Sequence, residues 1–78
     1  MIFRHFEHYE AVASALPVEG GYQAVIAVKT RDPDARPKVH VLADGHRYDL
    51  AFEAEEVAHA ALARVLEVSA EGELLWEE

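Results

Sequence analysis

The side chains with the widest chemical scope in this sequence are its five histidines, in a chain of 78 residues. His5 and His8 are three residues apart, a spacing that puts both on one face of a helix but on opposite faces of a strand. His40 would lie near Asp49 across a hairpin, and a histidine with a carboxylate partner serves as a metal ligand, a base or a surface pair. No recognised ligand spacing is present and cysteine is absent. The sequence therefore predicts no metal site and no cofactor.

The serines and glycines form no catalytic motif. Ser14 and Ser69 lie outside any nucleophile-elbow context, and the four glycines form no phosphate-binding loop. A domain of this size also has little room for a ligand pocket. We therefore predict no catalytic residue and no enzyme activity. An enzyme would instead show a concave site that holds at least two of His40, His46, Tyr48 and Asp49.

The formal net charge of −8 repels nucleic acid and anionic membranes on average. The charge is unevenly placed, because five of the seven basic residues lie between positions 29 and 47, whereas eight acidic residues follow from Glu53 onward. Four aspartates lie among these bases, at Asp32, Asp34, Asp44 and Asp49. We predict no nucleic-acid partner. The alternative is a nucleic-acid-binding domain that uses the basic hairpin of residues 29–47, by analogy with sheets that read the major groove.

The longest helical pattern runs from Glu53 to Ala70. Acidic residues at its start suit the positive end of a helix dipole, and Gly72 is predicted to supply the left-handed residue that ends the helix. Its apolar residues recur three and four apart as one buried stripe, made of Ala54, Val57, Ala58, Ala61, Leu62, Val65 and Leu66.

Two strands are predicted before the helix, over residues 9–16 and 22–29. Val25, Ile26 and Val28 favour the second strand, and the segment from Pro17 to Gly21 is a turn signal between the two. A helix over residues 2–16 is the alternative, because apolar residues in that segment also recur at heptad spacing.

A second hairpin is predicted over residues 38–52. Asp44 and Gly45 suit the centre of a type I′ turn, which would pair Val41 with Tyr48 and His40 with Asp49. This register puts five apolar side chains on the face that the helix covers, namely Val39, Val41, Tyr48, Leu50 and Phe52. The two prolines and two aspartates between Thr30 and Pro37 predict a mobile hairpin loop before it.

Together these elements predict a single domain over residues 1–78 of the α+β class. It has a small antiparallel sheet of three to four strands followed by one amphipathic helix packed on one face, and a short C-terminal tail in which Trp76 packs. The absence of cysteine, of an N-terminal signal pattern and of any apolar run near the roughly 18 residues of a membrane span predicts an unprocessed cytoplasmic protein with no membrane partner.

One helix is too narrow to cover a four-stranded sheet, so an uncovered surface is expected to bind a partner. By the predicted register that surface carries Ala11, Ala13, Ala15, Val25, Ala27 and Leu42, with Gln23, Lys29, His40 and Arg47 among them. We take Val25, His40, Leu42 and Arg47 as the candidate interaction residues. The predicted function is a non-catalytic binding or protein-interaction module that forms a homodimer or binds another protein. The alternative is a monomer whose N-terminal segment and Trp76 fold over this surface.

Overall fold

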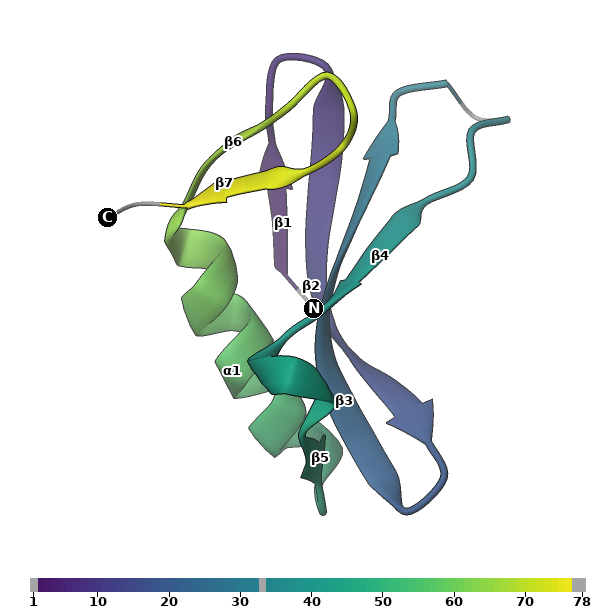
Figure 1. Ribbon diagram of the computed structural model, residues 1–78, viewed down its shortest axis with the longest axis vertical. Coiled ribbons are helices and arrows are strands. Elements are labelled where there is room, and N and C mark those ends of the chain that lie inside the picture. The colour runs from purple at the N-terminus through teal and green to yellow at the C-terminus, as the bar shows by residue number, and fades with distance from the viewer. Residues whose placement is uncertain (1, 33, 77–78) are drawn as a thin grey trace.

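The computed structural model describes residues 2–32 and 34–76. An antiparallel sheet with the order β1-β2-β3-β4 forms one layer, and a helix together with a C-terminal hairpin forms the other (Figure 1). The predicted α+β class, a small antiparallel sheet with one helix on one face, is confirmed. The elements are β1 (Ile2–His5), β2 (Tyr9–Val18), β3 (Gly21–Thr30), β4 (Lys38–Val41), the 3₁₀ turn η1 (Ala43–Gly45), β5 (Arg47–Tyr48), α1 (Ala51–Ala63), β6 (Val65–Val68) and β7 (Leu74–Trp76).

The long hairpin of β2 and β3 forms the centre of the sheet, and both of its predicted strands are confirmed. Its register runs without a break from the Tyr9 and Thr30 pair to the Val18 and Gly21 pair. Gly21 has φ +152°, and a Cβ atom there would clash with the carbonyl oxygen of Tyr48 in β5. Only glycine fits this close approach. The alternative of a helix over residues 2–16 is wrong, because β1 pairs with β2 as an antiparallel strand.

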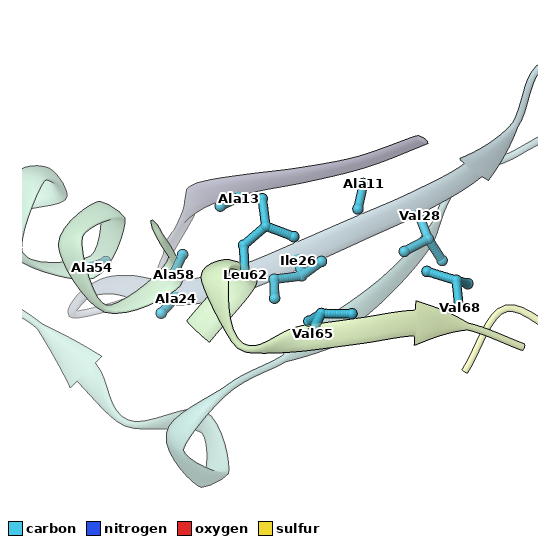
Figure 2. Packing of buried hydrophobic residues seen from close by; sticks show 10 residues of the cluster. All are labelled: Ala11, Ala13, Ala24, Ile26, Val28, Ala54, Ala58, Leu62, Val65 and Val68. Carbon is cyan, nitrogen blue, oxygen red and sulfur yellow. The ribbon is translucent and has the colours of Figure 1, made fainter. Parts of the chain in front are cut away.

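The buried core lies between the sheet and the second layer (Figure 2). Small side chains on the two sides of this boundary allow the helix to approach the sheet closely, and Leu62 and Ile26 are the largest side chains that it buries completely. The sheet contributes Ala11, Ala13, Ala24, Ile26 and Val28, α1 contributes Ala54, Ala58 and Leu62, and β6 contributes Val65 and Val68.

The predicted assignment of the sheet faces was wrong in β2. Ala11 and Ala13 were expected on the uncovered face, but both are fully buried under the second layer. Val25 and Ala27 do lie on the uncovered face, as predicted, because they alternate with the buried Ala24, Ile26 and Val28. Close packing of the helix against the sheet favours small side chains such as alanine at these positions.

The predicted hairpin of residues 38–52 was also wrong. β4 and β5 do not pair with each other; both pair with the same edge of β3, β4 opposite residues 25–28 and β5 opposite Tyr22 and Gln23. The segment between them is a protruding turn in which Ala43, Asp44 and Gly45 have φ values of 52°, 53° and 78°. The Asp-Gly pair therefore adopts the left-handed conformation that was predicted, but the chain returns to β3 after the turn.

This pairing reverses the expected orientation of several side chains. Val39 and Val41 face away from the helix and are 49% and 47% exposed, while Leu50 and Phe52, expected in the core, are 53% and 57% exposed. Tyr48 packs against the core as predicted. Val41 is opposite Val25 and Tyr48 is opposite Tyr22 on β3, so these two side chains lie on opposite faces of the sheet and not on one face, as the predicted hairpin required.

The helix is shorter than predicted. α1 begins at Ala51 and ends at Ala63, and the Leu50 amide donates a hydrogen bond to Glu53 Oε1 at 3.2 Å at its start. The predicted last turn instead forms β6, in which Leu66 is 61% exposed rather than buried. The predicted tail forms a hairpin with β7, where Gly72, at φ +81°, lies in the turn. Trp76, expected to pack, is 42% exposed.

Side chains of the sheet hold the C-terminal hairpin in place. Arg4 Nη1 donates to the carbonyl oxygens of Leu62 at 2.8 Å and Val65 at 2.6 Å. Three further contacts are Tyr9 Oη donating to the Ala70 carbonyl at 2.7 Å, His40 Nε2 with the Gly72 carbonyl at 2.8 Å, and the Lys38 and Glu73 ion pair. The helix and the hairpin thus share one face of the sheet (Figure 1).

Candidate interaction surface

The opposite face of the sheet has no second layer over it among residues 2–32 and 34–76. The molecule measures 34 × 32 × 19 Å, and its smallest dimension matches one sheet layer and one covering layer at about 10 Å each. We call this surface the open face. It consists of Phe3, Val12, Ser14, Leu16, Val25, Ala27, Val39 and Val41.

The strand register aligns the open face into rows that cross the sheet. One row contains only apolar side chains and spans all four strands, as Phe3, Val12, Ala27 and Val39. The next row contains Ser14, Val25 and Val41. Phe3 is 58% exposed, Val39 49% and Val41 47%. These two rows form an apolar band, interrupted by Ser14, whose exposed side chains lie on the edge strands β1 and β4.

Polar side chains flank the band at both ends. At one end lies a charged row of His5, Glu10 and Lys29, in which Glu10 is directly opposite Lys29 and His5 Nδ1 lies 3.4 Å from Glu10 Oε1. At the other end Gln23 is opposite Arg47 and donates to the Gly45 carbonyl at 3.0 Å. An apolar centre with a polar rim is the usual organisation of a protein–protein interface.

The four residues predicted as the interaction surface do not share one face. Val25 lies on the open face but is 5% exposed, and Arg47 lies at its rim, where it donates to the Glu19 carbonyl at 3.2 Å. His40 and Leu42 lie on the covered side, the first bonded to Gly72 and the second packed against the core. The pairing of β4 with β3, and not with β5 as predicted, accounts for this separation.

Sequence reasoning missed more than half of the residues that make up the band. Phe3, Val12, Val39 and Val41 belong to strands that alternate larger apolar residues with alanine, histidine or a charged residue. That alternation indicates two distinct faces in each strand. With the alanines assigned to the face that the helix covers, it would have identified these four residues as members of the open face.

The two segments expected to cover this surface in a monomer lie elsewhere. β1 extends the sheet at its edge and contributes Phe3 to the open face. Trp76 pairs with Val65 in the hairpin on the covered side.

The histidines are distributed over separate parts of the molecule. His40, predicted to approach Asp49, instead contacts Gly72, and His46 packs edge-on against Tyr48 with ring centroids 4.6 Å apart. In the described part of the chain, no three His, Asp or Glu side chains are grouped as a metal site would require. Helix α1 has 13 residues, and no helix of the described residues is long and apolar enough to cross a membrane.

A shallow concavity of about 490 Å³ lies at the protruding turn. It is lined by the consecutive residues Ala43, Asp44, Gly45, His46 and Arg47. Of the four residues whose convergence would indicate an enzyme, only His46 is in this lining. Groups from separate elements do not converge there as they do in a catalytic site.

The basic residues of the 29–47 segment are spread over both faces of the sheet. Lys29 lies beside the open face, whereas Lys38 pairs with Glu73 on the covered side. Arg31 and Arg47 donate to the carbonyl oxygens of Phe6 and Glu19. These four side chains therefore do not lie in a single basic stripe of the type that binds a phosphate backbone.

The Lys38 and Glu73 pair is the clearest electrostatic feature of the covered side. The Lys38 ammonium donates a hydrogen bond to the Glu73 carboxylate and, with its charge and a smaller contribution from His40, lowers the pKa of Glu73. This pair holds the turn of the C-terminal hairpin against β4.

Comparison of the chain with protein-family models, with curated protein sequences and with solved structures finds no match in any of the three.

Proposed function

We propose that the protein is a non-catalytic protein-interaction module that self-associates as a homodimer through the open face. The observation that carries the proposal is the apolar row that spans all four strands. Phe3 and Val39, at its two ends, remain 58% and 49% exposed. A continuous apolar patch with a polar rim is the kind of surface that is buried by a protein partner.

The size of the open face sets the strength that we expect for the dimer. Four strands are about 19 Å wide, and the seven residues from Glu10 to Leu16 extend about 23 Å along the sheet. Two such faces bury roughly 900 Å² in total, which is below the roughly 1,200 Å² of stable specific interfaces and in the range of weak, transient ones. The dimer should therefore exchange with the monomer, and it should be detected at tens of micromolar protein.

Light scattering coupled to size exclusion tests the proposal. At tens of micromolar protein and moderate salt, which screens the repulsion between two acidic chains, the wild type should have the mass of two chains. Val39→Lys places a charge at one end of the apolar row and should give the mass of one chain. Lysine is tolerated on edge strands, so the fold should persist, as circular dichroism would verify.

Leu66→Lys is the matched control. It introduces the same charge at an apolar residue that is 61% exposed on β6, away from the open face, and it should leave the mass at two chains. A wild type with the mass of one chain at this concentration contradicts the proposal. A dimer that persists in folded Val39→Lys protein removes the open face as the interface.

A further inference from the structure

We infer that the two copies stack their open faces with the two-fold axis parallel to the strands, so that β2 of one copy lies over β3 of the other. This arrangement rests on the proposed homodimer. The interface it forms is a sandwich of two sheets, in which strands of packed sheets stay within about 30° of one another. A two-fold axis along the mean strand direction allows this angle. The strands of the two copies then deviate from the axis by equal angles in opposite directions.

The axis determines which side chains meet. A two-fold rotation about an axis along the strands exchanges β1 with β4 and β2 with β3, and it keeps each row over the same row of the second copy. The apolar row therefore pairs with itself in reverse. Phe3 faces Val39 of the second copy, and Val12 faces Ala27 of the second copy. A larger side chain lies over a smaller one near the axis, which suits close packing.

The charged row gives the stronger argument for this axis. Glu10 and Lys29 are opposite each other on β2 and β3, so the same rotation places Glu10 over Lys29 of the second copy and Lys29 over Glu10 of the second copy. Each carboxylate then has an ammonium group both beside it and above it. Charges that are removed from water on dimerisation are thereby paired, which satisfies the requirement for burying them.

An axis perpendicular to the strands would not pair these charges. It reverses the order of the rows, so with the axis on the apolar row it places Glu10 over Ser14 and Lys29 over Val25 of the second copy. A perpendicular axis between the apolar row and the row of Ser14 and Val25 places Glu10 over Leu16 of the second copy. In both cases a charge is buried against a side chain that does not neutralise it, and that costs free energy.

The chain has no cysteine, so single introduced cysteines report the arrangement directly. Phe3→Cys and Val39→Cys are prepared separately and treated with a short bismaleimide, alone and as an equal mixture. Within one copy these positions are three strand spacings apart, about 14 Å, and the linker is chosen shorter than that distance. The inferred axis brings the thiol at position 3 of one protein close to the thiol at position 39 of the other but separates equal positions. A covalent dimer should therefore form in the mixture and in neither single variant.

Linking of either variant with itself overturns the inference. Phe3→Cys linking alone indicates a perpendicular axis or β1 edge pairing, and Val39→Cys linking alone indicates a perpendicular axis or β4 edge pairing. A mixture that is dimeric by light scattering but does not link also overturns it. A perpendicular axis leaves the proposed homodimer intact, edge pairing would also remove the open face as its interface, and a monomeric wild type removes both proposals.

Nuclear magnetic resonance of the unmodified protein provides the second measurement, which is independent of any effect of cysteine on association. In a mixture of isotope-labelled and unlabelled wild-type chains, the inferred axis gives intermolecular nuclear Overhauser effects between the Phe3 ring and the Val39 methyl groups. Within one copy these groups are too far apart to give this signal. Its absence from a sample that is dimeric by light scattering overturns the arrangement.

Discussion

Leu62 is the largest side chain that the helix buries, and half of the ten residues of the buried core are alanines. We expect Leu62→Ala to lower the free energy of unfolding by roughly 2–5 kcal/mol, because it removes buried methyl groups and leaves a cavity that small neighbours do not fill. Such a loss is a large fraction of the stability of a small domain. Urea denaturation followed by circular dichroism measures it.

Leu66→Ala is the control with the same chemical change. Leu66 is 61% exposed, so its truncation should change the free energy of unfolding by no more than about 0.5 kcal/mol. Equal losses for the two variants would mean that Leu62 is not in the core.

The ion pair between Lys38 and Glu73 predicts a dependence of stability on pH. Because Lys38 lowers the pKa of Glu73 in the folded state, the pair stabilises the fold above the unfolded-state pKa of about 4.3, and this contribution disappears as pH falls through the lower folded-state pKa. The difference in unfolding free energy between wild type and Glu73→Gln should therefore be present at neutral pH and vanish in acid. Urea denaturation across this pH range measures it.

Lys38→Met removes the cause of the pKa shift and should abolish the same pH-dependent difference. If the difference between wild type and Glu73→Gln stays constant from neutral to acidic pH, the pair does not contribute in this way.

Among the elements, the β2–β3 hairpin depends most on a single turn residue. Gly21→Ala should destabilise the protein more than Gly20→Ala, although both glycines have positive φ. The Gly20→Ala change has only the backbone cost of a left-handed alanine, roughly 1–2 kcal/mol, since the added Cβ makes ordinary contacts with the Arg47 side chain. The Gly21→Ala change would also push a methyl group against the backbone of β5. Denaturation of both variants measures the difference, and an equal loss would show that β5 moves freely away from β3.

The elements that the sequence predicted correctly are those fixed by local signals. β2 and β3 combine strand-forming residues with a glycine turn between them, and the presence of α1 follows from its apolar stripe, although the helix begins at Ala51 and not at the predicted Glu53. The pairing of β5 was not predictable in this way, because Asp44 and Gly45 specify a turn but not which strand the chain joins after it. β6 was missed because Val65 and Leu66 continue the helical spacing of the preceding residues.

The candidate surface was predicted only in outline. That one face of the sheet stays uncovered follows from the width of a helix and was expected, but the identity of its residues depends on which face the helix selects. Both faces of β2 are apolar, since Ala11 and Ala13 alternate with Val12 and Leu16. Periodicity alone does not show which face of β2 packs against the helix. The close contact between helix and sheet determines it, because only the alanine face allows that contact.

At the scale of the whole molecule, stability and self-association should be linked. If the folded protein dimerises, its thermal midpoint should rise with protein concentration, because mass action favours the state that binds a second copy. The midpoint of Val39→Lys should be independent of concentration. Calorimetry at two well-separated concentrations measures both, and a wild-type midpoint that does not move would contradict a dimer that couples to folding.

The protruding turn at residues 43–45 also bears on whether assembly ends at two copies. Sheet edges with free backbone groups can add strands without limit and give fibrils. Along this edge the chain offers only the four residues of β4 and the two of β5, with three left-handed residues between them that no straight strand can follow. Sideways growth is therefore interrupted at this edge, while the proposed stacking of open faces would close after one partner. At the edge formed by β4 and β5, the turn should thus limit fibril formation in a protein that keeps apolar side chains in solvent.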